Sequence, residues 1–289
     1  MRKISIGLPV FNEEKKIKKV LNNIISQNYR NKEVIISDNC STDLTGLICR
    51  KFSKKFKFIK YYRQKKKIDL FKNFNFVLKK SKGYYFTWQA ADDLRSKNYL
   101  NNNVNFLDRN LSYVASTGIS KLDKKKFLIN KVSFAFDGSL HSRIWTFIFY
   151  KWLLKGILDS VIRIKIIRKF PYNNFPNYFV RDWTVIFFLI LSGKINRDRY
   201  SHVKIGSQGI SFKNDAVAFQ RYNKKDFIEK LFPFYYFTNH SLVLIKSQKF
   251  ITKIYLLFFL IILNFFIYPR MFLQKLFRFF NKYLKLTFL

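Results

Sequence analysis

The first 120 residues alternate between short apolar runs and segments with helical periodicity, and this alternation limits the fold more than any other feature. Ile4 to Leu8 is a short apolar run that predicts a buried strand. Further strands are predicted at residues 33–37, 58–62, 84–88 and 113–120. Helices are predicted between them, at residues 13–27, 44–52, 70–78 and 97–109. Strands that alternate with helices predict an α/β fold, with a mostly parallel sheet flanked by helices.

Three of the predicted strands end abruptly at polar, loop-forming residues. Their sequences are SIGLPVFNEE at 5–14, VIISDNCSTD at 34–43 and YFTWQAADD at 85–93. Because parallel strands of an open sheet end at one edge, we expect the side chains that follow them to gather there, where such sheets bind ligands. The candidate ligand-binding residues in these pieces are Pro9, Phe11, Glu13, Asp38, Asn39, Asp92 and Asp93.

From residue 141 onward the apolar runs become longer. The runs IWTFIFYKWLL at 144–154 and WTVIFFLIL at 183–191 are too short to cross a bilayer, so they predict buried helices. Before them, LDKKKFLINKVSFAF at 122–136 predicts an edge hairpin whose lysines face solvent. These elements complete the same domain rather than starting a new one.

After Glu229 the sequence is basic and hydrophobic and contains no acid, which predicts a domain of residues 1–229 followed by C-terminal helices at 230–289. As a helix, the apolar run from Ile254 to Tyr268 would be about 22 Å long, shorter than the ~30 Å hydrocarbon core of a bilayer. Cations follow it at Arg270, Lys275, Arg278, Lys282 and Lys285. We therefore expect peripheral binding to the anionic surface of a membrane, while core packing and a tilted span stay open as alternatives.

The chain carries 55 Lys and Arg against 17 acids, a formal net charge of +38, which predicts an anionic partner. Nucleic acid, anionic lipid and phosphorylated substrates all meet this requirement. Residues 51–67, KFSKKFKFIKYYRQKKK, interleave cations with aromatic rings, so a basic nucleic-acid-binding protein is the alternative function. No RRM, KH or helix-turn-helix pattern accompanies this run, and we expect no nucleic-acid partner.

The cysteines and the N-terminal sequence bear on the compartment. Cys40 and Cys49 are not in a CxxC arrangement and form no disulfide framework, which fits a reducing compartment. The opening MRKISIGLPV leads directly into charged residues, without the apolar core of a signal peptide. We expect a cytoplasmic protein that is peripheral to the inner face of the cell membrane.

The pieces PVFNEE, ISDNCSTD and AADD, in this order, resemble the family 2 glycosyltransferases with the GT-A fold. Those enzymes usually read Pro-x-Tyr-Asn-Glu, then Asp-Asp-Gly-Ser-Thr-Asp, then x-Asp-Asp. The resemblance covers residues 3–110 closely, and HSRIWTFIFYK, VRDWTVIFFLILSGK and IGSQGIS resemble the family's acceptor half more loosely. It implies a nucleotide-sugar-binding half at 1–120 and an acceptor half at 121–229, in front of the helices at 230–289.

The resemblance implies an inverting, metal-dependent enzyme of polysaccharide biosynthesis. Such an enzyme moves a sugar from a nucleotide-diphosphate sugar to a lipid-linked or cell-surface glycan acceptor. Asp93, with Asp92 beside it, is expected to hold Mg²⁺ or Mn²⁺, because these ions prefer oxygen ligands and leave positions open for phosphates. Ala91 stands where the family often has a further acid, and a helix-capping role for Asp92 is the alternative.

The remaining assignments concern the donor and the acceptor. Asp38 and Asn39 are expected to read the nucleobase and ribose, with an Asx turn as the alternative. Phe11 replaces the commoner Tyr and keeps a ring that can stack on the base. Glu13 fits either a donor contact or the first turn of a helix. Asp182 is the expected general base, with a structural acid at a helix N-terminus as the alternative.

Overall fold

The computed structural model describes residues 1–122, 135–149, 156–172, 181–206, 234–245 and 250–262. The chain divides into two compact units. Unit 1 comprises Met1–Pro176 and Val185–Gly209, and unit 2 comprises Asn177–Thr184 and Ile210–Leu289. The predicted boundary at residue 230 falls within 207–233, outside the described residues, so the predicted division into domains stays a prediction.

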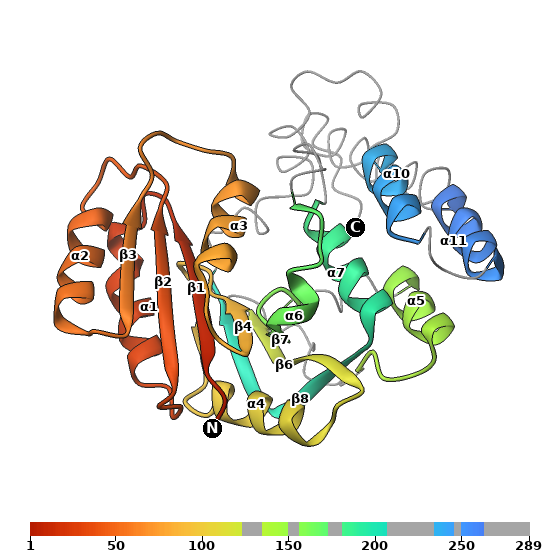
Figure 1. The fold of residues 1–289 in the computed structure, drawn as a ribbon, viewed down its shortest axis with the longest axis horizontal. Coiled ribbons are helices and arrows are strands. Elements are labelled where there is room, and N and C mark those ends of the chain that lie inside the picture. The colour runs from red at the N-terminus through yellow and green to blue at the C-terminus, as the bar shows by residue number, and fades with distance from the viewer. Residues whose placement is uncertain (123–134, 150–155, 173–180, 207–233, 246–249, 263–289) are drawn as a thin grey trace, which may run out of the picture. The chain divides into compact units, whose positions relative to one another are not determined.

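Unit 1 is built on one eight-stranded sheet in the order β3-β2-β1-β4-β7-β6-β8-β5 (Figure 1). The strands are β1 (Ile4–Val10), β2 (Lys32–Asp38), β3 (Ile59–Arg63), β4 (Tyr85–Trp88), β5 (Leu94–Arg95), β6 (Tyr113–Leu122), β7 (Val161–Arg163) and β8 (Lys194–Ile205). Strands β3, β2, β1 and β4 run parallel to one another, and β6 is parallel to β8. The pairs β4–β7, β6–β7 and β5–β8 are antiparallel. The predicted mostly parallel α/β sheet is confirmed.

The helices of unit 1 follow the predicted alternation. They are α1 (Glu14–Ile25), α2 (Thr45–Lys55), α3 (Leu70–Lys80), α4 (Tyr99–Arg109), α5 (Leu140–Phe149) and α6 (Ile164–Ile167). Helix α7 (Arg181–Ser192) begins in unit 2 and continues in unit 1. Most of the predicted edge hairpin, residues 123–134, lies outside the described residues.

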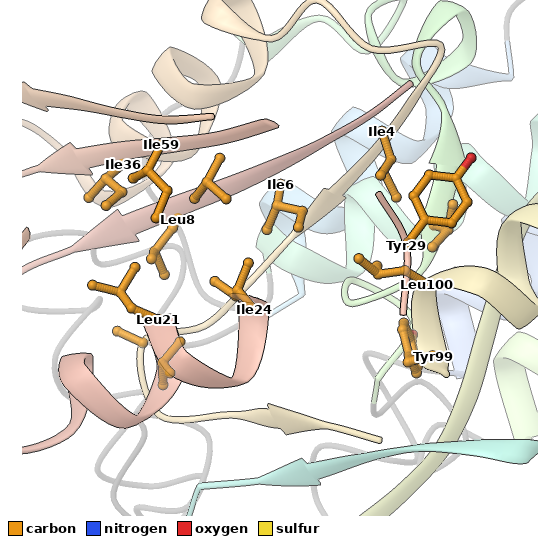
Figure 2. Close-up of a cluster of buried hydrophobic side chains, with 14 of the residues drawn as sticks. Ile4, Ile6, Leu8, Leu21, Ile24, Tyr29, Ile36, Ile59, Tyr99 and Leu100 are labelled. Carbon is orange, nitrogen blue, oxygen red and sulfur yellow. The ribbon is translucent and has the colours of Figure 1, made fainter. Parts of the chain in front are cut away.

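The core of unit 1 forms where α1 packs on the central strands (Figure 2). Every residue of β1 is buried, as expected for a central parallel strand that is covered on both faces. Ile6 and Leu8 of β1 pack with Leu21 and Ile24 of α1, whose apolar residues recur at helical spacing. Burying each such side chain contributes about 1.5–3 kcal/mol. This packing holds the strand ends rigidly in place.

A buried carboxylate ties together the N-terminal ends of the central strands. Glu33, at the start of β2, is 2% exposed. It accepts hydrogen bonds from Ser5 Oγ at 2.6 Å and Lys82 N at 2.7 Å, and its ion pair with Lys3 Nζ is 3.0 Å long. Ser5 Oγ in turn accepts from Gly83 N, just before β4. These contacts join β1, β2 and the approach to β4 at one end of the sheet.

The described part of unit 2 consists of the first residues of α7 and of helices α10 (Tyr235–Leu244) and α11 (Phe250–Ile262). The Trp183 ring stacks on Phe234, with ring centroids 5.8 Å apart, and contacts Phe237 edge-on. Helices α10 and α11 lie within the range 230–289 that was predicted to be helical, and residues 263–289 lie outside the described ranges. None of the helices in the described ranges is long and apolar enough to cross a membrane.

Candidate functional site

The strand ends predicted to meet do lie at one edge of the sheet. In the parallel register, Val10 of β1 pairs with Asp38 of β2, and Gly7 pairs with Trp88 of β4. Backbone hydrogen bonds extend this pairing: Asn39 N donates to Val10 O at 2.9 Å, and Gln89 N donates to Gly7 O at 2.9 Å. Pro9 lies inside β1 and is buried. The loops at 11–14, 39–44 and 89–93 therefore surround a common region.

The first two loops are joined by hydrogen bonds between their polar side chains and backbones. Asn12 N donates to Ser41 Oγ at 3.0 Å, and Thr42 N donates to Asn12 Oδ1 at 2.9 Å. Asn12 and Cys40 both adopt left-handed backbone conformations, with φ of 52° and 65°. Such conformations cost about 1–3 kcal/mol each and persist where the surrounding structure fixes them. The loops are therefore held in one shape before any ligand binds.

Glu13 lies at the start of α1, within the influence of the other acids. Its backbone N donates to Thr45 Oγ1 at 2.7 Å, and its carboxylate forms an ion pair with Lys16 at 3.2 Å. Burial raises the pKa of the Glu13 carboxyl, Lys16 opposes this, and the charges of Asp92 and Asp43 raise it further. Glu13 thus lies near Asp92, although 79 positions separate them in sequence.

Asp38 is fully buried, and its carboxylate is engaged within the protein. It accepts hydrogen bonds from Ser41 N at 2.8 Å, Tyr61 Oη at 2.7 Å and Arg63 Nη1 at 3.0 Å. Arg63 Nη2 also donates to Ser41 O at 2.8 Å. The bond to Ser41 N is a local bond from side chain to backbone, of the type found in the Asx turn that was the alternative prediction for Asp38. Asp38 thereby fixes both the Ser41 loop and the exposed Arg63 guanidinium.

Asn39 fastens a basic loop to the end of β2. Its Oδ1 accepts from Ile68 N at 2.8 Å, and its Nδ2 donates to Ile68 O at 2.9 Å. This clamp fixes the loop at residues 64–69, whose Lys67 ammonium lies 4.1 Å from the centroid of the Phe11 ring. Phe11 is 37% exposed, so a cation and an aromatic ring meet at the rim of the site. The amide of Asn39 therefore acts on the loop that carries Lys67.

Asp93 is a buried acid in the loop that follows β4, directly before β5. It is 6% exposed, and its Oδ1 accepts a hydrogen bond from Gly206 N at 2.8 Å. Burial raises the pKa of Asp93 to about 8; the charges of Asp159 and Asp92 add to this, while Gly206 N and Arg95 oppose it. A Cβ atom at Gly206 would overlap the carboxylate of Asp92. The end of β8 is thus fitted directly against the two acids.

Two residues whose charges influence Asp93, namely Arg95 and Asp159, were not among the predicted site residues. Arg95 of β5 is 4% exposed and donates to Thr87 Oγ1 at 2.8 Å, and its charge lowers the pKa of Asp93. Asp159 precedes β7, and β7 pairs with β4. Neither residue belongs to a recognisable motif, because strand β5 has only two residues and β7 only three. A single acid before a three-residue strand gives no sequence signal.

Asp182 is described within unit 2, in the first turn of α7. Burial raises the pKa of its carboxyl to about 6, against the backbone N–H groups of Trp183 and of Asp182 itself. A carboxyl with this pKa is mostly ionised at neutral pH and can accept a proton. Its assignment as the general base stays a prediction.

The acids of unit 1 suit a divalent cation by their chemistry. Carboxylate oxygens are the ligands that Mg²⁺ and Mn²⁺ prefer, and Asp92 and Asp93 offer them at the end of β4. In the described part of the chain, no three His, Cys, Asp or Glu residues are grouped so that they could hold an ion by themselves. Phosphates and water would complete the coordination of an ion held by one or two carboxylates.

Comparison with known sequences places these features in a family. The profile described as "Glycosyl transferase family 2" matches residues 5–175. An uncharacterized glycosyltransferase of Rickettsia bellii is 31% identical over 144 residues, which are 49% of this chain and 20% of that protein. The dolichyl N-acetyl-alpha-D-glucosaminyl phosphate 3-beta-D-2,3-diacetamido-2,3-dideoxy-beta-D-glucuronosyltransferase of Methanococcus voltae is 36% identical over 113 residues, 38% of this chain and 35% of that protein. The chain matches less than half the length of these relatives.

Solved structures share the fold. TarS 1–349 of S. aureus superimposes with a TM-score of 0.58 at 19% identity, covering 85% of this chain and 82% of that one. The mannosyltransferase PcManGT from Pyrobaculum calidifontis, in complex with GDP-Man and Mn²⁺, gives a TM-score of 0.58 at 14% identity, covering 89% of this chain and 78% of that one. The predicted GT-A fold is confirmed by these likenesses.

Proposed function

The chain belongs to glycosyl transferase family 2, and on this basis we propose that it transfers a sugar from a nucleotide-diphosphate sugar to a lipid-linked or cell-surface glycan, inverting the anomeric configuration. One observation carries the proposal: the ends of β1, β2 and β4 bring Phe11, Glu13, Asp38, Asn39 and the Asp92–Asp93 pair to one edge of the sheet. An edge of this kind binds nucleotides in open α/β sheets.

The donor would lie along this edge, from the end of β2 to the end of β4. Structures of TarS include complexes with UDP and UDP-GlcNAc, and PcManGT binds GDP-Man, which supports a nucleotide-diphosphate sugar here. In the proposed arrangement Phe11 and Pro9 line the nucleoside. Asp38 contributes to donor binding indirectly, because it holds Arg63 and the Ser41 loop at the edge of the nucleoside site. Asn39 contributes by fixing the loop of Lys67.

A divalent cation, Mg²⁺ or Mn²⁺, would be held by Asp93, with Asp92 and Glu13 close by. When bound, such an ion stabilises the negative charge of the leaving diphosphate. The fit rests on the Asp93 carboxyl: it is buried among acids, and its high pKa reflects a site that favours a positive charge or a proton. Mn²⁺ in the PcManGT complex supports the same assignment.

The acceptor hydroxyl would lose its proton to Asp182. A carboxylate in hydrogen-bond reach of a nucleophilic hydroxyl acts as a general base, and its efficiency is greatest when its pKa is near the working pH. The pKa of about 6 suits this role. Direct displacement with such a base gives an inverted anomeric product.

The proposal for the acceptor and the location is supported by the exposed surface of α11. One side of this helix presents apolar side chains to solvent, among them Phe250, which is 76% exposed, and Phe258, which is 62% exposed. The exposed apolar residues of α11 are Phe250, Ile251, Ile254, Tyr255, Leu257, Phe258 and Ile261. The residues from Lys230 to the last residue contain nine Lys and Arg and no acid, which favours an anionic lipid surface over a second copy of this strongly basic chain. We place the enzyme at the inner face of the cell membrane, where it meets a lipid-linked acceptor.

A donor panel tests the function. The purified chain is incubated with UDP-GlcNAc, UDP-glucose and GDP-mannose, with Mn²⁺ or with chelator, and release of the nucleoside diphosphate is measured. We expect metal-dependent turnover of at least one donor, and Asp93→Asn should abolish most of it. Absence of donor binding and turnover, together with tight RNA binding at about 0.15 M salt, would favour the nucleic-acid alternative instead.

Liposome flotation tests the membrane surface. The variant with Leu257→Glu and Phe258→Glu should lose binding to vesicles that contain anionic lipid, because both side chains lie on the exposed face of α11. Leu111→Glu is the matched control, since Leu111 is 76% exposed in unit 1, outside α11. Equal flotation of all three proteins would exclude this surface. A change of oligomeric state in the double variant alone would identify a second copy as its partner.

A further inference from the structure

Asp159 is held beside Asp93 by an unusual concentration of hydrogen bonds on its main chain. Its carbonyl oxygen accepts from Thr87 Oγ1 at 2.9 Å, from Arg95 Nη2 at 3.1 Å and from Tyr99 Oη at 3.0 Å. These donors come from β4, β5 and α4, so separate elements of unit 1 converge on one peptide group. The backbone of Asp159 is therefore fixed at the end of β4, next to the Asp92–Asp93 turn.

The side chain of Asp159, in contrast, has no hydrogen-bond partner in the part of the chain that the structure describes. Within the described residues, no group donates a hydrogen bond to its carboxylate, and the charged groups that influence it are Arg95, Asp92 and Asp93. Burial raises the pKa of the Asp159 carboxyl; Arg95 acts against this, and Asp92 adds to it. An ionised carboxylate can accept hydrogen bonds but cannot donate them. The half-buried carboxylate of Asp159 therefore needs a hydrogen-bond donor that the described protein groups do not supply.

Two further polar atoms in the same region also lack hydrogen-bond partners among the residues that the structure describes. The Nε of Arg95 and the Oε1 of Gln89 are buried and make no hydrogen bond among the described residues. Gln89 and Arg95 are 1% and 4% exposed. Gln89 Nε2 donates to Asp93 O at 2.9 Å, which places this side chain against the same turn. Unsatisfied buried polar groups of this kind occur at functional sites, and the partly exposed Asp159 carboxylate is a group here that a bound molecule can reach.

The chemistry of the site selects the group that Asp159 can bind. A phosphate would be repelled by a carboxylate that already faces Asp92 and Asp93. The divalent cation is assigned to Asp93 and Asp92, and within the described ranges no three acids are grouped so that they could hold an ion together. In a nucleotide sugar, the remaining donors are the imide of the base and the hydroxyls of the sugar. The base is assigned to the end of β2, which leaves the hydroxyls.

We propose that Asp159 accepts a hydrogen bond from a hydroxyl group of the transferred sugar and thereby selects the donor sugar. This inference rests on the proposed function and adds a specificity residue to it. The fixed backbone gives the carboxylate a defined position, as a selective hydrogen bond requires. A sugar that lacks the matching hydroxyl, or presents it in the other configuration, leaves the carboxylate unpaired and binds more weakly.

Paired titrations test the proposal. Wild-type protein, Asp159→Ala and Asp159→Asn are titrated with UDP-GlcNAc and UDP, and with GDP-mannose and GDP, all in Mn²⁺. For the donor that binds, Asp159→Ala should lose roughly 10- to 100-fold in affinity, the usual cost of a hydrogen bond to a charged group. Affinity for the matching nucleoside diphosphate should change less than about twofold, because the sugar is absent. Asp159→Asn should be intermediate, since its amide oxygen still accepts.

The controls separate the possible failures. Asp137→Ala removes an exposed acid of unit 1 outside the cluster and should leave both affinities unchanged. The variants should fold, because the bonds from Thr87, Arg95 and Tyr99 go to the main chain, and melting curves verify this. Equal losses for the diphosphate and the nucleotide sugar, or no loss for either, would overturn the role of Asp159. If the wild-type chain binds no nucleotide sugar, the proposed function itself is wrong.

Discussion

Replacing Asp93 by Asn should stabilise the ligand-free protein while weakening its donor site. The Asp93 carboxyl has a pKa of about 8 in the folded chain, against an ordinary value of 3.8. Because the folded state holds this proton more tightly than the unfolded state does, stability falls as pH rises from about 4 to about 8. Asparagine keeps the shape and can still accept from Gly206 N, but it carries no charge to bury.

The size of the stabilisation by Asp93→Asn follows from the pH interval between the ordinary pKa of Asp93 and neutral pH. Between the ordinary pKa of 3.8 and neutral pH there are about 3 units, and each unit corresponds to 1.36 kcal/mol, which gives an upper bound of about 4 kcal/mol. Because the charges of Asp159 and Asp92 contribute to the raised pKa of Asp93, we expect about 1–4 kcal/mol in favour of Asp93→Asn near pH 7. For a chain of this size this corresponds to a rise in melting temperature of at least about 2 °C.

Thermal unfolding followed by circular dichroism at several pH values measures the difference. The gap in stability between variant and wild type should widen from pH 5 to pH 8. It should close below about pH 4, where the Asp93 carboxyl becomes protonated in the unfolded state as well as in the folded state. Mn²⁺ with nucleotide should reverse the order by stabilising the wild type alone. Asp137→Asn, which neutralises an exposed acid, should show no such slope. A less stable Asp93→Asn protein at pH 8 would refute the reasoning.

Three other predictions concern separate parts of the site. Asp182→Asn should lower kcat by roughly 10²- to 10⁴-fold with little change in donor affinity. The kcat of the wild type should fall below pH 6 as Asp182 becomes protonated, and the variant should not show this fall. Near-normal turnover of the variant would eliminate Asp182 as the base. Cys40 should react with maleimide and be protected by nucleotide, whereas buried Cys49, whose pKa is raised to about 12, should stay unlabelled. Mass spectrometry distinguishes the two cysteines. Labelling of Cys40 that nucleotide does not reduce would place the nucleotide elsewhere. Asn39→Ala should free the loop at 64–69, so that trypsin cuts faster after Lys67 and nucleotide affinity falls; unchanged cleavage would show that the clamp is dispensable.

The central strands could be predicted because their sequences are apolar and end at polar residues. Strands β1 to β4 lie within two residues of the predicted ranges. For β1, β2 and β4 the reason is that strands buried on both faces read as largely apolar runs. Strand β8 could not be recognised, because its sequence KINRDRYSHVKI is mostly polar. Its buried positions include Arg197 and Ser201, which an apolar pattern does not reveal. Tertiary contacts rather than local sequence place this strand in the sheet.

The candidate site shows the same division. Convergence of the three loops was predictable, because it follows from parallel strands and their ends. The partners of individual side chains were not predictable, because they depend on loop paths. Asn39 bonds to the backbone of Ile68, and Asp38 bonds to Arg63. Asp159 lies near Asp93 because β7 pairs with β4 and because side chains of three elements bind its carbonyl oxygen, which no spacing in the sequence indicates.

The buried contacts of Glu33 have a consequence for the evolution of this fold. They fasten the starts of β1, β2 and β4 at the edge of the sheet opposite to the candidate site. A strand that slipped by one residue would turn its buried side chains outward, and this fastening opposes such slippage. Loops at the far ends can therefore change length and chemistry without disturbing strand alignment. A scaffold anchored in this way can acquire new donor preferences through loop substitutions alone, and grafting loops from relatives onto it is a practical route to altered sugar selectivity.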